Sequence, residues 1–538
     1  MSVDTNNAAF QDALNLIQYT RQSIFLTGKA GTGKSTFLRY VCEHTKKKYV
    51  VLAPTGIAAI NAGGSTMHSF FKLPFYPLLP DDPNLSLQRG RIHEFFKYTK
   101  PHRKLLEQIE LVIIDEISMV RADIIDAIDR ILRVYSHNLR EPFGGKQLLL
   151  VGDVFQLEPV VKNDEREILN RFYPTPYFFS ARVFGQIDLV SIELQKVYRQ
   201  TDPVFVGVLD HIRTNTAGAA DLQLLNTRYG SQIEESEADM YITLATRRDT
   251  VDSINEKKLA ELPGESITFE GVIEGDFPES SLPTSQELVL KPGAQIIFIK
   301  NDFDRRWVNG TIGVIAGIDE EEETIYVITD DGKECDVKRD SWRNIRYRYN
   351  EKTKEIEEEV LGSFTQYPIR LAWAITVHKS QGLTFSRVVI DFTGGVFAGG
   401  QAYVALSRCT SLDGIQLKKP INRADIFVRP EIVNFAGRFN NRQAIDKALK
   451  QAQADVQYAA AARAFDKGDM EECLEQFFRA IHSRYDIEKP VPRRLIRRKL
   501  GIINTLKEQN KKLKEQMREQ QERLRQYAHE YLLMGNEC

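Results

Sequence analysis

Cysteine and long hydrophobic runs are scarce in this chain of 538 residues, and their scarcity excludes several classes of protein. The cysteines number five and form no C-x-x-C pair, which argues against a disulfide framework or a zinc site and predicts a reducing compartment. They are Cys42, Cys335, Cys409, Cys473 and Cys538. No apolar run approaches the roughly 20 residues of a membrane span, and residues 1–14 lack the order of a signal peptide. We therefore expect a cytoplasmic protein with no membrane partner, associated with the nucleoid if the source is bacterial.

The chain also lacks an excess of charge of either sign. Its 72 Lys and Arg residues nearly balance 74 Asp and Glu residues, and the net charge is −2. The molecule as a whole would not attract nucleic acid, so any contact with a polyanion must be local. The composition, 42% hydrophobic and 27% charged, is that of a globular protein, and the length predicts several domains.

What the sequence does contain is a phosphate-binding motif. Residues 28–35 read GKAGTGKS, which fits G-x-x-x-x-G-K-[ST], between a predicted strand at Ile24–Thr27 and a predicted helix at Thr36–Val41. A glycine-rich turn would match the motif alone, but the flanking strand and helix favour a nucleotide site. Backbone N–H groups would bind the phosphates, Lys34 would reach the β- and γ-phosphates of ATP, and Ser35 would ligate Mg²⁺. The predicted nucleotide-binding residues of this motif are Gly28, Gly31, Thr32, Gly33, Lys34, Ser35 and Thr36.

Two further predicted strands are followed by polar residues of the kind that ATP hydrolysis requires. LVIIDEISM (111–119) carries Asp115 and Glu116 at the end of its apolar run, and LLLVGDVFQLEPV (148–160) carries Gln156. The carboxyl ends of parallel strands meet at the edge of a sheet where the phosphate loop also lies. We expect Asp115 to hold Mg²⁺, Glu116 to orient or deprotonate the attacking water, and Gln156 to sense the γ-phosphate. The structural alternatives are a solvated acidic turn and an ordinary surface glutamine.

Hydrolysis also needs positive charge on the γ-phosphate, and an arginine supplied across a cleft is worth about 10³ to 10⁵ in rate. The candidates are Arg199 in LQKVYRQ and Arg408 in YVALSRC, both in the second half of the chain. A site divided between two halves would link hydrolysis to the opening and closing of a cleft, as in a motor. Taken singly, each arginine would more often be a surface ion-pair partner.

Predicted strands divide the chain into two α/β halves with additions. The strands are 24–27, 49–53, 111–114 and 147–151 in the first half, and 241–245, 387–391 and 415–417 in the second. Residues 71–103 are rich in proline and aromatic residues and predict a small surface insertion. Residues 288–362 alternate like the strands of a small SH3-like barrel.

From about Phe435 onward the sequence is helical. Residues 460–481 resemble one tetratricopeptide-type helix pair with a Gly-Asp turn. Residues 501–534 carry a seven-residue pattern that fits either a coiled coil or an exposed helix docked on its own chain. The pattern comprises Ile503, Leu506, Asn510, Leu513, Met517, Gln520, Leu524 and Tyr527. A basic cluster at 493–499 could bind DNA, act as an import signal or be a solvated helix face.

In their order, the motifs resemble those of the Pif-type (petite integration frequency) DNA helicases of superfamily one group B, which are related to RecD. The resemblance covers roughly residues 8–432 and rests on GKAGTGKST, VLAPTGIAAINAGGSTMHSFF, IIDEISM, GDVFQLEPV, ELQKVYRQTDPVFVGVLDHIR, TRRDTVDSIN, AITVHKSQGLTFSRVVID and AYVALSRC. It implies an α/β fold with two RecA-like P-loop domains, a small wedge insertion and an SH3-like β-barrel insertion; a helical C-terminal extension lies outside it. It also implies ATP-driven 5′-to-3′ travel on single-stranded DNA, with unwinding of tailed duplexes and G-quadruplexes, in DNA replication, repair, recombination or telomere maintenance.

The resemblance also implies where the domains lie. We expect RecA-like domain 1A at 1–187 with a wedge, 1B, at about 69–104; domain 2A at 188–250 and 363–432; insertion 2B at 251–362 with its barrel from about 285; a helical extension at 433–498; and a possible coiled coil at 499–538.

The family's DNA contacts map onto loops with suitable chemistry. Hydroxyl, imidazole and backbone donors suit phosphate oxygens, and an aromatic ring offers a base a stacking face. The predicted DNA-binding residues are Thr55, Gly56, Ser65, Thr66, His68 and Phe70 in the first half, and Thr376, His378 and Lys379 in the second. Gln381 and Gly382 would face the nucleotide, Gln11 or Gln18 would read the adenine, and residues 71–80 would split the duplex. A structural histidine is the alternative for His68 and His378.

Two other functions are compatible with these residues. One is a regulatory P-loop ATPase or adaptor whose C-terminal helices recruit a protein or a second copy. The other is a translocase that strips proteins from DNA without productive unwinding, or one that acts on RNA.

Overall fold

The computed structural model describes residues 4, 7–86, 91–200, 202–230, 240–304, 306–350, 352–353, 355–483 and 490–536. They form two compact units, Met1–Leu449 and Lys450–Cys538, which we treat separately. None of the helices among these residues combines the length and the hydrophobicity that a membrane crossing requires.

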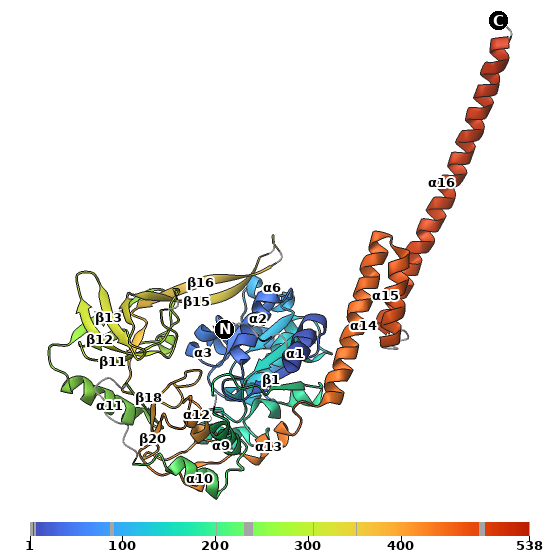
Figure 1. Cartoon of the computed structure of the whole chain (residues 1–538). Helices are drawn as coiled ribbons and strands as arrows, with labels where there is room; N and C mark the ends of the chain where they lie inside the picture. The colour runs from blue at the N-terminus through green and yellow to red at the C-terminus, as the bar shows by residue number, and fades with distance from the viewer. Residues whose placement is uncertain are drawn as a thin grey trace. The chain divides into compact units, whose positions relative to one another are not determined.

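A six-stranded parallel sheet forms the centre of the first half, where Figure 1 labels β1. The strand order is β3-β2-β4-β5-β1-β6. Its strands are β1 (Ile24–Gly28), β2 (Tyr49–Ala53), β3 (Ser65–Thr66), β4 (Leu111–Ile114), β5 (Gln147–Val151) and β6 (Val190–Leu194). The four strands predicted for this half are confirmed. Because β6 pairs with β1 from Val190 to Leu194, the sheet continues past the domain boundary predicted at residue 187.

Both faces of this sheet are buried, which explains why its strands are continuous apolar runs. Phe25, Val50 and Val112 belong to one apolar cluster and their neighbours Leu26, Val51 and Ile113 to another, because successive side chains point to opposite faces. The helices of this half are α1 (Ala8–Tyr19), α2 (Lys34–His44), α3 (Gly56–Ala62), α4 (Met67–Phe71), α5 (Arg91–Phe95), α6 (Lys100–Gln108), α7 (Ala122–Tyr135) and α8 (Asn163–Leu169).

The predicted insertion at residues 71–103 has an exposed tip and a buried base. Phe75 and Tyr76 are 83% and 52% exposed. Leu78 and Phe96, by contrast, belong to the apolar cluster beneath the first sheet. The described part of this segment is therefore anchored in the core and presents its aromatic tip to solvent.

A four-stranded parallel sheet in the order β18-β7-β19-β20 forms the centre of the second half. Its strands are β7 (Ile242–Ala245), β18 (Ala374–Thr376), β19 (Val388–Asp391) and β20 (Ile415–Leu417), which confirms the three strands predicted there and adds β18. The accompanying helices are α9 (Pro203–Arg213), α10 (Ala219–Asn226), α11 (Arg248–Glu261), α12 (Gln401–Leu406) and α13 (Pro430–Ala436).

Antiparallel strands form three small sheets between β7 and β18. A five-stranded sheet contains β11 (Gln295–Phe298), β12 (Ile312–Asp319), β13 (Thr324–Thr329), β14 (Glu334–Val337) and β17 (Ile369–Leu371); β9 (Val272–Gly275) joins β15 (Asp340–Asn350) and β16 (Glu355–Gln366); β8 (Ile267–Glu270) pairs with β10 (Glu287–Leu290). The barrel predicted at 285–362 thus needs β17, which lies beyond its predicted end. The β15–β16 hairpin also reaches the first half, where the ring of Tyr347 is buried and its hydroxyl accepts a hydrogen bond from Val51 N at 3.3 Å.

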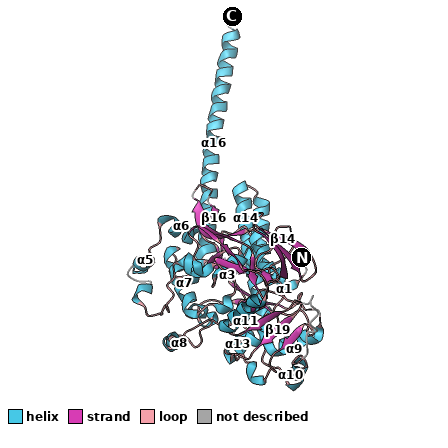
Figure 2. Ribbon diagram, turned by 90° about the vertical axis from the view of Figure 1, so that its left-hand side faces the viewer, coloured by secondary structure: helices cyan, strands magenta, loops and turns pink. Residues whose placement is uncertain are grey.

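The C-terminal unit is helical, as the sequence predicts. Its helices are α14 (Arg442–Lys467), which begins in the first unit, α15 (Met470–Ser483) and α16 (Pro490–Asn536). Gly468, with φ of +83°, and Asp469 form the predicted turn between α14 and α15. Figure 2 shows α16 as one uninterrupted helix.

Candidate active site

The phosphate-binding motif adopts the predicted strand–loop–helix geometry. β1 ends at Gly28 and α2 begins at Lys34, with Gly33 as its N-cap in the left-handed region at φ +88°. Gly31 has φ of +80°, and a Cβ atom there would lie 2.4 Å from Cβ of Arg199. The loop therefore requires glycine for its backbone conformation and for the close approach of Arg199.

Lys34 lies folded back on this loop. Its Nζ donates to the carbonyl oxygens of Gly28 at 2.6 Å and Lys29 at 3.0 Å. Burial lowers the pKa of Lys34, while Asp153 and Glu116 raise it. The ammonium group thus sits between the loop and the acidic strand ends, where a bound phosphate would be.

Asp115 and Glu116 follow β4 directly, as predicted. Burial, then the neighbouring Asp115, raises the pKa of Glu116 to about 7, and Lys34 and Arg408 lower it. Burial also raises the pKa of Asp115, whose Oδ1 accepts a hydrogen bond from Glu116 N at 2.9 Å. Glu116 has φ of +50°, an uncommon conformation for a residue other than glycine that is concentrated at functional sites.

The donor set at this position fits a magnesium ion. Burial raises the pKa values of two adjacent carboxyl groups, so a cation would stabilise their ionised forms, and Ser35 adds an exposed hydroxyl at the start of α2. Hard divalent cations prefer such oxygen ligands. The residues present are therefore suited to Mg²⁺ accompanying a nucleotide.

Arg408 is buried, 1% exposed, and has no anionic partner among the described residues. Its guanidinium donates to the carbonyl oxygens of Val404, Ser380 and Leu383 and to the Ser407 hydroxyl. Burial, followed by the charge of Arg199, lowers the pKa of Arg408 to about 9. A buried cation without a counter-ion is costly, so this position favours the arrival of an anion.

Arg199 connects the phosphate loop to the second half. It packs against Gly31, and its guanidinium donates to the carbonyl oxygens of Ser407 at 3.3 Å and Gly382 at 3.5 Å. Ala30 N donates to the hydroxyl of Tyr403 on α12 at 3.0 Å. The loop, the two predicted arginines and Gly382 are thus brought together as predicted.

Gln156 is buried beside a charged pair that the sequence analysis missed. Its Nε2 lies 3.5 Å from Asp153 Oδ2, and Asp153 forms an ion pair with Arg213 at 3.1 Å. Arg213 also pairs with Glu193 at 2.9 Å. Arg213 ends the LDHIR run of the family signature, which was the available signal; its partner Asp153 precedes it by 60 residues.

The predicted DNA-binding residues of the first half differ in accessibility. Thr55 and Thr66 cap α3 and α4 with their hydroxyls, and Gly56 packs against Ser281 of the insertion. The imidazole of His68 stacks on Phe75, with ring centroids 5.0 Å apart, and its pKa is lowered by burial, then by Arg121. Ser65 is buried as well, at 7% exposed.

The stacking role predicted for Phe70 does not fit the structure. Phe70 is 3% exposed and packs against Phe71, His102 and Tyr347 of the β15–β16 hairpin. Its ring faces are therefore occupied by the core. The sequence could not reveal this burial because Tyr347 is distant along the chain.

In the second half, Lys379 lies in a cluster of positive charge. Burial, then Arg370 and Arg248, lowers the pKa of Lys379 to about 8, against a smaller opposing effect of Asp252. Arg370 itself has a pKa lowered by burial, then by Arg248. Because the chain as a whole is nearly neutral, any positive surface for a polyanion had to be local, and this cluster is such a surface. Arg370 and Arg248 were not predicted as members of it.

The other predicted residues of this half lie close by in sequence and structure. Thr376 Oγ1 accepts a hydrogen bond from Lys379 N at 3.2 Å, and burial lowers the pKa of His378. Gln381 has a buried Nε2 atom without a hydrogen-bond partner. Gln11 and Gln18 are partly buried on α1, and no described contact assigns either of them to an adenine.

Two parallel sheets, a phosphate loop, Arg199 after the last strand of the first sheet and Arg408 from the second half define a P-loop ATPase whose site spans two RecA-like domains. Residues 4–207 match the family model for the PIF1-like helicase. The ATP-dependent DNA helicase Pif1 of Bdellovibrio bacteriovorus is 31% identical over 439 residues, which cover 79% of this chain and 90% of the relative. The chain therefore belongs to the PIF1-like helicase family.

Other relatives agree. The Pif1 helicase of Campylobacter jejuni is 33% identical, covering 73% of this chain and 88% of the relative, whereas the chain spans 60% of the PIF1 helicase of Emericella nidulans. Among solved structures, Bacteroides sp Pif1 in complex with ADP-AlF4 is 42% identical with a TM-score of 0.73, covering 80% of this chain and 96% of that one. Pif1 helicase from Candida albicans is 28% identical with a TM-score of 0.61, covering 81% and 99%.

Proposed function

We propose that this chain is an ATP-dependent DNA helicase that moves 5′-to-3′ on single-stranded DNA and unwinds tailed duplexes. The observation that carries the proposal is Arg408, a buried cation from the second RecA-like domain without an anionic partner in the described structure. A nucleotide at the phosphate loop supplies the missing negative charge. Binding and hydrolysis then change the attraction between the two domains, which is what movement requires.

The chemical roles follow from the surroundings of each residue. Lys34 exchanges its loop carbonyls for phosphate oxygens, and Ser35 and Asp115 would hold Mg²⁺, which would neutralise phosphate charge. Glu116, whose pKa is about 7, accepts a proton from the attacking water when it is ionised. Arg199 and Arg408 stabilise the charge that develops on the γ-phosphate.

Gln156 links this chemistry to domain movement. Its backbone carbonyl closely approaches Gly400, where a Cβ atom would lie 2.3 Å from Gln156 O, and α12 begins at the next residue. A shift of Gln156 on loss of the γ-phosphate therefore acts directly on the helix that precedes Arg408. Gln381 and Gly382 complete the nucleotide cleft from the second domain.

DNA is held by one surface from each domain. Thr55, Gly56 and Thr66 supply the first, with the imidazole of His68 as the stacking platform in place of Phe70. Thr376, His378 and Lys379 supply the second, reinforced by Arg370 and Arg248. Alternate gripping by the two surfaces gives steps along the strand.

The exposed tip at Phe75 and Tyr76 is the wedge that separates the strands. Replacing both residues with Ala should reduce unwinding about tenfold, because a base loses a stacking platform worth roughly 1–3 kcal/mol. DNA-stimulated ATP hydrolysis should change by less than about twofold. Loss of both activities together would refute the wedge assignment. G-quadruplexes, as further substrates, can be tested with the same variant.

The decisive experiment compares 5′-tailed and 3′-tailed duplexes of DNA and of RNA. Unwinding of 5′-tailed DNA alone, with ATP turnover that rises steeply with single-stranded DNA and falls with salt, supports the proposal. ATP turnover that ignores DNA would identify a switch instead. DNA-stimulated turnover with protein displacement but no strand separation would identify a protein-stripping translocase.

A further inference from the structure

Helix α16 carries an apolar stripe that continues farther than the sequence analysis recognised. Its members recur at alternating spacings of three and four residues, which defines the a and d positions of a coiled coil. We call this stripe the α16 seam, and it comprises Ile503, Leu506, Asn510, Leu513, Met517, Gln520, Leu524, Tyr527, Tyr531 and Met534. Tyr531 and Met534 extend the pattern into a fifth heptad.

The seam is exposed. Leu513, Leu524 and Tyr531 are 56%, 66% and 78% exposed, and the other apolar members from Leu506 onward are more than half exposed. Within the C-terminal unit, therefore, neither α14 nor α15 covers the seam over this length. Contiguous apolar surface of this extent marks an interaction site.

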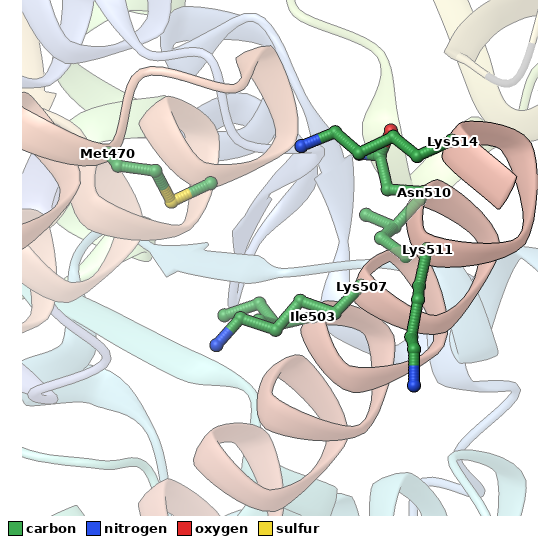
Figure 3. Close-up of a pocket in the computed structure, with 7 residues that line it drawn as sticks. Met470, Ile503, Lys507, Asn510, Lys511 and Lys514 are labelled. Atoms are coloured by element: carbon green, nitrogen blue, oxygen red, sulfur yellow. The ribbon is translucent and has the colours of Figure 1, made fainter. Parts of the chain in front are cut away.

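An open groove of about 750 Å³ runs beside the first two heptads of the seam. Met470 of α15 forms one wall, and Ile503, Leu506 and Asn510 contribute to the other. Figure 3 shows Lys507 and Lys514 extending towards Met470, while Lys511 points away from it. A second helix could lie along the seam and contact Met470 at this end.

The two polar members of the seam identify the partner. We propose that α16 pairs with α16 of a second copy of this chain, in a parallel and in-register coiled coil. In that arrangement Asn510 faces Asn510 of the other copy and Gln520 faces Gln520, so each amide finds an amide partner. An antiparallel alignment can oppose Asn510 with Gln520, but it places Tyr531 opposite Lys499, outside the seam, whereas the parallel alignment matches every member of the seam with its own kind.

The residues on either side of the seam are also compatible with a parallel, in-register pair. In a parallel dimer, Lys514 of one copy lies beside Gln509 of the other, and Gln521 lies beside Gln516. The third flanking pair places Arg523 beside Ala528. None of these three pairs therefore brings two like charges together. The acidic Glu508, Glu515 and Glu522 occupy the outward position, where they keep the helix soluble.

The length of the seam is sufficient for a stable pair. Residues 503–534 extend over about 48 Å of helix at 1.5 Å per residue. The seam covers more than four heptads, and a pattern sustained over three to four heptads already indicates a coiled coil. The dimer would join two motor units, and the proposal for α16 stands whether or not the motor unwinds DNA.

Sedimentation of the full-length chain without DNA tests this inference. Two chains per particle are expected at micromolar concentration. The double variant L513K/L524K places charge in the seam and should raise the dissociation constant at least about a hundredfold, giving monomers. The control N504K/Q526K adds the same charge at outward positions and should stay dimeric. Both variants should keep wild-type ATP turnover per chain, which shows that the motor is folded.

Orientation is tested by cross-linking. Both cysteine variants are made in a chain that also carries Cys538→Ser, so that the native C-terminal cysteine cannot cross-link. Leu524→Cys should form a disulfide between chains under mild oxidation, because position 524 meets itself only in the parallel register. Gln526→Cys, on the outer face, should not. A monomeric wild-type chain, or an L513K/L524K variant that remains dimeric, would overturn the proposal. A dimer without the Leu524→Cys cross-link would overturn the parallel register.

Discussion

Arg213 and Arg408 are both buried arginines near the nucleotide site, and their surroundings are opposite. Arg213 forms ion pairs with Asp153 and Glu193 and lies over the ring of Phe155, 4.4 Å from its centroid. Burial lowers the pKa of Arg213, but Asp153, Tyr403 and Glu193 together outweigh burial, so the net shift is upward. Arg408 donates to carbonyls and one hydroxyl, and burial lowers its pKa to about 9.

The comparison separates two uses of a buried charge. A cation whose counter-ions are built into the protein holds two segments together, whereas a cation without them awaits an anionic ligand. Arg213 joins α9 to Asp153, which follows β5, and to Glu193 on β6, so it stabilises the junction between the sheets. Arg408 is held in place but not neutralised, so its position favours catalysis over stability.

Replacing each of the two arginines with methionine should show that one acts in catalysis and the other in stability. Arg408→Met removes the charge while filling the space, and should lower DNA-stimulated ATP turnover about 10³-fold or more, the range for an arginine that stabilises the γ-phosphate. Its melting temperature should stay within a few degrees of wild type, because no counter-ion is left unpaired. Steady-state turnover and thermal melting measure the two effects. Turnover within tenfold of wild type would contradict the catalytic role.

Arg213→Met should do the reverse. It leaves Asp153 and Glu193 without their buried partner, so the free energy of unfolding should fall by about 3–5 kcal/mol. Urea denaturation followed by tryptophan fluorescence or circular dichroism measures this loss. The Arg408→Met chain is the matched control and should unfold near the wild-type urea concentration. Equal destabilisation by both substitutions would show that the two arginines do not differ in kind.

The contrast between these arginines also shows what sequence alone can reveal. The phosphate loop, Asp115 and Glu116 were predictable because each motif is contiguous and lies at the end of an apolar strand. Arg408 was predictable through its motif. The pairing of Arg213 with Asp153, the burial of Phe70 under Tyr347 and the addition of β6 to the first sheet depend on contacts between distant segments. Local periodicity carries no information about such contacts, so the structure was needed to find them.

The positive cluster around Lys379 extends the comparison to the DNA surface. The pKa of Arg370, like that of Arg408, is lowered by burial and by a neighbouring arginine, here Arg248. Arg370→Gln should weaken binding of single-stranded DNA about tenfold and reduce the slope of log affinity against log salt by about 0.7. Fluorescence anisotropy over a salt series measures both. Arg306→Gln, at a site whose arginine is neutralised by Asp302, is the control and should bind as wild type does. An unchanged salt slope in Arg370→Gln would exclude a phosphate contact.

The smallest effect should lie in the pH dependence of hydrolysis. Burial, then Asp115, raises the pKa of Glu116 to about 7, and the charge of Arg408 is among the influences that lower it. Because a base must be ionised, kcat/KM for ATP should be high above pH 7 and fall as the pH drops through that value, by about tenfold per unit. Arg408→Met removes a positive charge, so the acid limb of its residual activity should move to higher pH, by less than about one unit. Arg408→Lys keeps the positive charge, so its activity should fall at the same acidic pH as that of the wild type. Arg213 is not among the groups that shift the pKa of Glu116, so any folded Arg213 variant should also keep the wild-type pH profile. Single-turnover rates at saturating Mg²⁺ across pH 5.5–9 distinguish these cases. If the activities of Arg408→Met and Arg408→Lys fall at the same acidic pH, the charge of Arg408 does not affect the pKa of Glu116.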